Sequence, residues 1–228
     1  MNAAARGFAS TEALLQPMQD LLAGIYDLPT EYRVHDFLFT ERERLPPALR
    51  TSATDEQVLV LEQGGDAAVG LYLAPELLER LRAANPLEAL HGGNLADYWT
   101  ALEGVSHFLC LAWHAGHDRA VSLLELELQA EIDKYVTSWW LLRRQCPATH
   151  PAGLRRLLFE RTRIDPALAL GRERLYREAN RYAARFCGRL ERELPDRQRR
   201  VRAETLAGLR RFYRLNRERK LEHIDRLD

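Results

Sequence analysis

The segment from residue 94 to residue 145 most constrains the fold, because it predicts two long consecutive helices. We expect the first helix to begin at Asn94, a favourable N-cap residue after two glycines, and to run to about His117. The second helix is expected over about 120–142, with apolar residues on nearly two of its sides. A helix that is apolar over so much of its surface is typically central in a bundle. The rest of the chain is therefore expected to pack around this pair.

Polar residues follow one side of the first predicted helix and lie between the apolar strips of the second. In the first helix, spacings of four and seven residues bring Glu103, His107 and His114 onto one face. In the second, Glu127 and Glu131 lie between the strips, and Glu131 in particular is expected to be largely removed from water. A buried carboxylate needs a compensating partner, because desolvating an unpaired charge costs several kcal/mol.

These carboxylates and imidazoles define a candidate metal site. Helical bundles build iron, manganese and zinc sites from inward carboxylates and histidines on facing helices. The ligands of this hypothesis are Glu103, His107, His114, Glu127 and Glu131. The sequence lacks the repeated Glu-x-x-His pair of di-iron proteins, the His-Glu-x-x-His motif and paired cysteines. The same pattern is also typical of a polar helix face without a cofactor, in which Glu131 forms an ion pair with Lys134 or with an arginine.

The first 90 residues predict a small α+β unit. Two β-rich runs flank Gly64-Gly65 and predict a hairpin over 57–73, and the aromatic and branched residues of 32–39 predict a further strand. A helix over about 10–24 and a second one after Pro75 would cover this antiparallel sheet.

The remainder, 94–228, predicts an all-helical bundle, which could also form one continuous domain with the first unit. Beyond the two long helices, further helices are expected after residue 154, over 171–194 and over about 197–224. The fold class is therefore α+β and predominantly helical.

Charge is distributed unevenly along the chain although the net charge is zero. Residues 1–150 hold 11 basic and 21 acidic residues, a difference of −10, whereas residues 151–228 hold 22 and 12, a difference of +10. The two halves are expected to attract each other, within one chain or across a dimer. We expect structural ion pairs that involve Glu131 and Lys134 on the acidic side and Arg177 and Arg181 from an arginine row on the basic side.

A second group of arginines surrounds the aromatic pair Phe212-Tyr213. Its members are Arg210, Arg211, Arg214 and Arg217. Arginines beside aromatic residues can bind the phosphates and stack on the bases of a single nucleic acid strand. A helix whose aromatic residues pack inward while its arginines reach into water has the same pattern. An anionic or nucleic acid partner is therefore one alternative for this segment.

Compartment and function class are predicted mainly from absent signals. No apolar run reaches the roughly 18–20 residues that cross a bilayer, and the first residues lack a secretory-type apolar region. The three cysteines are odd in number and widely spaced, which favours reduced thiols and a cytoplasmic protein. No Walker, dinucleotide-binding or nucleophile-elbow motif is present.

We therefore predict a cytoplasmic interaction or regulatory protein that binds a protein partner or itself, without a cofactor and away from membranes. Two alternatives belong to other classes. The first is a metal-dependent helical-bundle enzyme that uses iron, manganese or zinc. The second is nucleic acid binding through the arginine-rich C-terminal helices.

Overall fold

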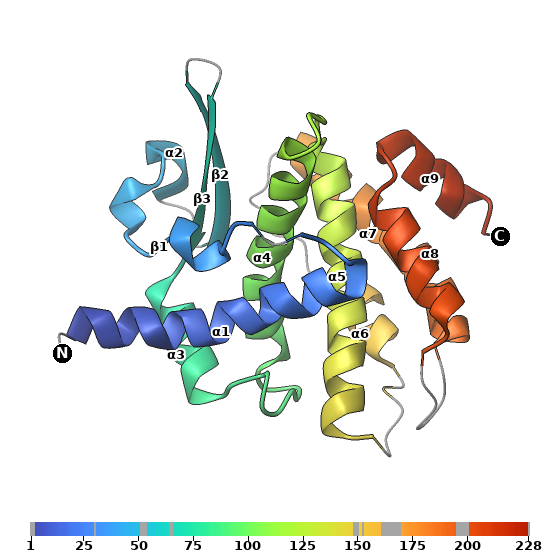
Figure 1. The fold of residues 1–228 in the computed structure, drawn as a ribbon, viewed down its shortest axis with the longest axis horizontal. Helices are drawn as coiled ribbons and strands as arrows, with labels where there is room; N and C mark the ends of the chain where they lie inside the picture. The colour runs from blue at the N-terminus through green and yellow to red at the C-terminus, as the bar shows by residue number, and fades with distance from the viewer. Residues whose placement is uncertain are drawn as a thin grey trace.

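The structure is a computed structural model, and its central feature is the expected pair of long helices. It describes residues 3–29, 31–50, 54–63, 66–147, 151, 153–160, 170–194 and 201–227. Helices α4 (Leu95–Ala115) and α5 (Leu123–Gln145) lie side by side in the middle of the molecule (Figure 1). The fold is α+β and predominantly helical, as predicted from the sequence.

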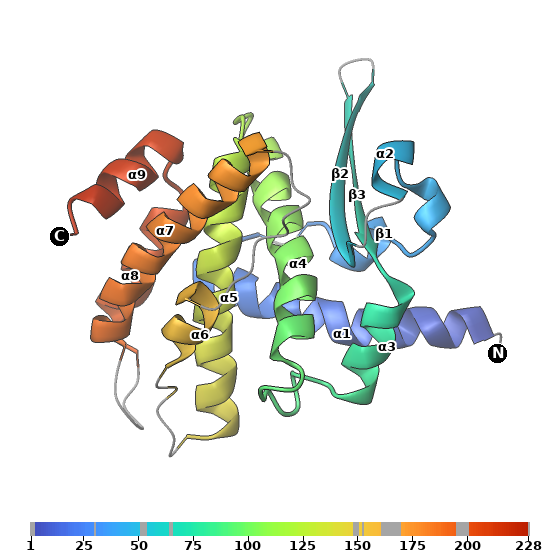
Figure 2. The ribbon, with the colours of Figure 1, turned by 180° about the vertical axis from the view of Figure 1, so that it is seen from behind.

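Two further long helices enclose this central pair from opposite sides. Helix α1 (Ala3–Tyr26) crosses one face of α4 and α5, and α7 (Leu170–Glu193) packs along α5 on the other face (Figures 1 and 2). The shorter helices are α2 (Pro47–Arg50), α3 (Pro75–Ala83), α6 (Leu154–Glu160), α8 (Ala203–Tyr213), α9 (Arg217–Asp225) and the 3₁₀ turns η1 (Val34–Phe37) and η2 (Arg42–Arg44).

The expected hairpin is confirmed, and its sheet is mixed. Strands β2 (Glu56–Gln63) and β3 (Asp66–Leu73) pair antiparallel, and the turn at residues 64 and 65 lies outside the described residues. The short strand β1 (Leu38–Phe39) pairs in parallel with β3, which gives the order β1-β3-β2. The hairpin extends away from the helices (Figure 1).

The prediction of a strand over 32–39 is wrong for most of that segment. Only Leu38 and Phe39 are in a strand, because the preceding backbone is held by a side chain of α1 instead of a sheet. The amide of Gln19 donates to the carbonyl of Tyr32 at 2.7 Å, and its oxygen accepts from the N–H of Val34 at 2.8 Å. These bonds satisfy the backbone groups that a ladder would otherwise pair.

A close approach between α4 and the sheet sets the position of the candidate site. A Cβ atom added at Gly104 would lie 2.6 Å from Leu71 Cδ1 and 3.0 Å from Glu56 Cγ. Only glycine therefore lets β2 and β3 come this near to the helix. Glu56, the first residue of β2, is brought beside the polar face of α4.

The last predicted helix is divided into two in the structure. The predicted residues 197–200 lie outside the described ranges, and the rest of the single helix expected to 224 is instead α8 and α9, because Asn216 caps α9 by accepting from the N–H of Arg219 at 3.1 Å. Helix α8 docks on the C-terminal end of α1. There Arg210 and Arg214 donate to the carbonyls of Ile25 and Tyr26, which have no partner within α1.

Buried apolar residues join the sheet and the helices in one cluster, which includes Leu15 of α1, Leu71 of β3, Val105 of α4 and Tyr135 of α5. The expected division of the chain near residue 90 stays a prediction. None of the helices in the described ranges has the length and hydropathy of a segment that crosses a bilayer.

Candidate metal centre

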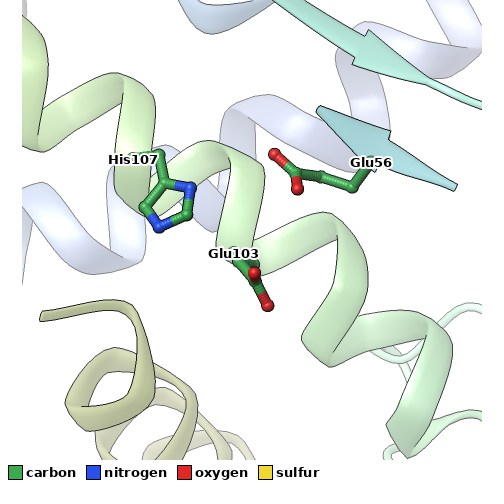
Figure 3. Close-up of side chains that lie close together, drawn as sticks. All are labelled: Glu56, Glu103 and His107. Carbon is green, nitrogen blue, oxygen red and sulfur yellow. The ribbon is translucent and has the colours of Figure 1, made fainter. Parts of the chain in front are cut away.

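Side chains from β2, α4 and α5, most of them acidic, lie close together. We call the group the carboxylate cluster, and its members are Glu56 of β2, Glu103 and His107 of α4, and Glu127, Glu131 and Lys134 of α5. Glu103 and His107 lie one helical turn apart and point the same way, while Glu56 reaches them from the strand (Figure 3). Four of the five residues predicted as metal ligands are therefore brought together, and Glu56 joins them.

The distances within the cluster suit a single shared ion. One ligand atom from each of Glu56, Glu103 and His107 can be chosen so that all three lie within 4.8 Å of one another. Glu127 extends the group, because its Oε2 atom is 3.7 Å from His107 Nε2. Ligand atoms of one metal ion that are each about 2.0–2.2 Å from it lie roughly 3 Å apart, so small side-chain rotations would complete such a shell.

Among the residues that the structure describes, one cation, Lys134, belongs to this cluster of four carboxylates. Lys134 Nζ is 2.5 Å from Glu103 Oε2 and 2.8 Å from Glu131 Oε1. With all four glutamates ionised and His107 neutral, the cluster would carry −4 + 1 = −3. Such a surplus inside a protein must be reduced by protonation or by a further cation.

The pKa values show that protonation meets this need when no other cation is bound. Burial, followed by the charge of Glu103, raises the pKa of Glu127 to about 8. The same two causes raise the pKa of Glu56 well above its usual range. Burial alone would also raise the pKa of Glu103, but Lys134 and His107 outweigh it and hold that pKa below its ordinary value.

His107 is prepared to act as a neutral ligand. Burial lowers its pKa to about 4, so the imidazole is uncharged at neutral pH. The residue is only 6% exposed, and its buried Nε2 atom has no hydrogen-bond partner among the residues that the structure describes. Glu56 Oε1 is likewise buried without a hydrogen bond from any described residue. Buried polar atoms without partners are unfavourable unless a ligand satisfies them.

The donor set fits a divalent transition metal. Three or four carboxylates and one imidazole suit manganese, iron or zinc, whereas thiolate-preferring ions would need sulfur ligands. The chain therefore offers a shell made of Glu56, Glu103, His107 and Glu127. Lys134 would remain on the outer side of Glu103, where it already holds the second oxygen of that carboxylate.

A second buried group, which we call the Asp133 network, lies on another face of the same two helices. It comprises Tyr26, Ser106, His114, Glu125, Gln129, Asp133 and Lys220. Asp133 accepts from Tyr26 at 2.6 Å, from Ser106 at 2.6 Å and from Gln129 at 2.8 Å. Lys220 Nζ lies 3.2 Å from Gln129 Oε1 and 3.4 Å from Glu125 Oε1.

His114 belongs to this second group and not to the carboxylate cluster. Its Nδ1 atom is 2.8 Å from the carbonyl oxygen of Cys110, and its Nε2 atom is 3.5 Å from Glu125 Oε1. Burial raises the pKa of the Cys110 thiol to about 12, so this cysteine stays protonated at neutral pH. The metal shell is therefore built without His114.

The arginines predicted to form ion pairs or to bind an anionic partner make several different contacts in the structure. Arg177 pairs with Glu173 within α7 at 2.6 Å, and the guanidinium of Arg181 lies 4.8 Å from the ring centroid of Tyr182. The expected ion pair between Glu131 and Lys134 is present, but Arg177 and Arg181 make these other contacts instead. Of the other arginine group, Arg210 and Arg214 bind the end of α1, Arg217 is 3.6 Å from Glu218, and Arg211 lines a pocket between α7 and α8.

Two residues of the cluster region were not predicted from the sequence. Glu56 comes from the hairpin, and Tyr176 of α7 donates a hydrogen bond to Glu127. Burial and the charge of Glu127 raise the pKa of Tyr176. Neither residue has a local motif, so only the packing of β2 and α7 against the long helices reveals them.

Comparison of the chain with protein-family models, with curated proteins and with solved structures finds no match. The geometry of the clusters is accordingly the basis for a functional proposal.

Proposed function

We propose that this protein is a metal-dependent enzyme that holds one divalent transition metal ion in the carboxylate cluster. Glu56, Glu103, His107 and Glu127 would be its ligands. The observation that carries the proposal is the buried Nε2 atom of neutral His107, which has no hydrogen-bond partner in the described part of the chain and faces a surplus of carboxylates, with Glu127 Oε2 at 3.7 Å. A dipositive ion would satisfy this atom and offset most of the surplus at once.

A bound metal would supply Lewis acidity or one-electron chemistry at this position. Two residues beside the proposed ligands would position them. Lys134 holds Glu103 and Glu131 in place, and Tyr176 holds Glu127 by a hydrogen bond. The burial of these groups excludes water from all but the outer side of the cluster, where Glu103 and Glu131 retain side-chain exposures of 23% and 14%.

Metal analysis and titration test the proposal directly. The purified chain is stripped with a chelator, reconstituted anaerobically with Mn²⁺, Fe²⁺ or Zn²⁺, and titrated by calorimetry. We expect about one ion per chain, with affinity at least about tenfold lower in His107→Ala. The matched control is His91→Ala, which changes an exposed histidine outside the cluster.

Either of two results would contradict the proposed metal site. One is that no ion binds the wild-type chain after reconstitution, and the other is that His107→Ala and His91→Ala bind equally well. If the ion binds as expected, hydrolytic and oxidative substrate panels with the loaded protein then test the enzymatic part.

The cysteines support a reducing compartment as part of the proposal. All three, Cys110, Cys146 and Cys187, are free thiols, and the first and last of them are buried. Disulfides form readily where secreted proteins fold, so three unpaired thiols favour the cytoplasm.

A second candidate function is self-association through the hairpin. Strand β2 is at the edge of the described sheet, and its Val60 and Leu61 are 47% and 61% exposed. Such an edge can add a strand from a second copy. Light scattering on wild-type protein should show a dimer that Leu61→Lys dissociates and Leu157→Lys, in α6, does not. A monomer at every concentration would rule this function out.

A further inference from the structure

A pocket of about 400 Å³ lies between the three C-terminal helices, and it shares no residue with the carboxylate cluster. Three arginines open into it, namely Arg189 of α7, Arg202 at the start of α8 and Arg211 of α8. Phe186 and His223 form part of the wall. A volume of this size matches pockets that take small organic ligands.

The charges around this pocket are incompletely compensated. Arg189 is paired with Glu193 at 2.6 Å, but Arg202 and Arg211 form no ion pair with any other residue in the described part of the chain. Glu193 and Glu204 also line the pocket, so the described lining residues carry a formal charge of 3 − 2 = +1 from three arginines and two glutamates. The pocket therefore favours a ligand with negative charge.

His223 reports the same positive surroundings. Its pKa is lowered by burial and then by Arg189, Arg211 and Arg226, while Glu193 acts more weakly in the opposite direction. The ring of His223 lies 5.6 Å from that of Phe212 and 6.4 Å from that of Phe186, centroid to centroid. An aromatic wall therefore adjoins the cationic groups, as a ligand with a flat apolar part would need.

A glycine keeps one side of the pocket open. Gly208 lies inside helix α8, where glycine costs about 1 kcal/mol relative to alanine. A Cβ atom at this position would meet nothing within 4 Å, so packing of the chain does not require glycine here. Its effect is to leave room within the pocket.

We propose that this pocket binds a small molecule that carries a phosphate group. Arg202 and Arg211 would hold the phosphate, because a guanidinium matches its oxygens with two parallel hydrogen bonds. The apolar wall that includes Phe186 would contact the body of the ligand. Inorganic phosphate and a nucleoside monophosphate share the recognised group and differ in whether they use this wall.

Calorimetric titration at constant ionic strength tests the proposal with inorganic phosphate, AMP and acetate as probes. We expect phosphate to bind, AMP to bind more tightly if the aromatic wall is used, and acetate to bind at least about tenfold more weakly than phosphate. Arg211→Gln should weaken phosphate binding about tenfold, whereas Arg192→Gln, an exposed arginine of α7 outside the pocket, should not change it.

Two further measurements keep the test independent of folding defects. Gly208→Met should block AMP by filling the pocket, while Gly208→Ala should leave the helix more stable. The NMR titration of His223 should shift to higher pH when phosphate is bound, because an anion favours the imidazolium. Absence of binding by phosphate and AMP, or equal phosphate affinity of Arg211→Gln and Arg192→Gln, would overturn the proposal.

Discussion

The carboxylate cluster and the Asp133 network are built on the same two helices, α4 and α5, but they differ in how their charges are compensated. In the network, Asp133 accepts three hydrogen bonds, and Lys220 lies between Glu125 and Gln129. In the cluster, one lysine faces four glutamates. Within the described ranges both groups contain buried atoms without a hydrogen-bond partner, His107 Nε2 and Glu56 Oε1 in the cluster and His114 Nε2 and Glu125 Oε1 in the network, so the surplus of negative charge is what sets the cluster apart.

This difference separates a structural role from a binding role. A buried polar group with its partners in place adds specificity and connects the elements that supply them. The network joins α1, α4, α5 and α9 in this way. A buried group with surplus charge lowers stability, and its retention at that cost is typical of ligand sites. Removing a charge should therefore have opposite effects on stability in the two regions.

The largest effect is expected from Lys220→Met. Lys220 is fully buried, so its loss leaves the buried Glu125 with His114 alone beside it and without a lysine to compensate its charge, and the free energy of unfolding should fall by about 3–5 kcal/mol. Urea denaturation measures this change. Arg219→Met alters an exposed neighbour and should change stability by less than about 0.5 kcal/mol. Equal unfolding midpoints for the two variants would remove the structural role assigned to the network.

Gly104→Ala tests the close approach that brings Glu56 into the cluster. Its Cβ would lie 2.6 Å from Leu71 Cδ1 of β3 and 3.0 Å from Glu56 Cγ of β2, so these side chains or their strands must move away from α4, at a cost of about 1–3 kcal/mol. The affinity for the metal ion should also fall in this variant, because Glu56 moves away from the other proposed ligands. In Gly24→Ala the new Cβ meets nothing within 4 Å, and this α1 variant should be slightly more stable than wild type. Unchanged metal affinity in Gly104→Ala would remove Glu56 from the proposed ligands.

The local parts of the fold could be predicted from the sequence, and the long-range parts could not. The two long helices and the hairpin have strong periodic or turn signals within about 20 residues, and both are present. Glu103 and His107 are four residues apart, so their shared direction follows from helix geometry. The participation of Glu56 depends on how closely the sheet packs at Gly104, which no local pattern encodes.

His114 and the segment 32–39 show two limits of periodicity. His114 returns to the face of His107 after seven residues, but it lies about 10 Å further along the helix axis, beyond the reach of one ion. Its neighbours there are Cys110 and Glu125. The segment 32–39 has strand-like residues, yet Gln19 of α1 binds its backbone. A side chain distant in sequence thus overrides the local preference.

The pH dependence of stability distinguishes the metal-free cluster from the network. The pKa of Glu127 is about 8 in the folded chain against 4.5 ordinarily, so the stability that its proton provides is lost as pH rises toward 8. The pKa of His107 is about 4 in the folded chain against 6.5 ordinarily, so this residue alters stability only below about pH 6.5. The pKa of Asp133 is about 6, so its contribution to stability changes little above pH 6. Between pH 6.5 and 8 the unfolding temperature of metal-free protein should therefore fall.

The size of this fall is at most about 1.4 kcal/mol per pH unit for one group, and differential scanning calorimetry can resolve it. A saturating metal ion should remove or reverse the fall, because it binds the ionised carboxylates and its affinity rises as their protons leave. A stability that is independent of pH in this window, with and without metal, would contradict the raised pKa of Glu127.

The smallest change in stability is expected from Glu127→Gln. At pH 7 most Glu127 side chains are already protonated, so the amide should stabilise the metal-free protein by less than about 1 kcal/mol. The variant should nevertheless show a smaller fall in unfolding temperature between pH 6.5 and 8, because only Glu56, whose pKa is also raised, still contributes to it, and it should bind metal at least about tenfold more weakly. Glu79→Gln, in which an exposed glutamate of α3 is changed, should retain both properties. If Glu127→Gln instead destabilised the chain as strongly as Lys220→Met, both buried groups would be structural, and the surplus charge of the cluster would have no connection to a ligand.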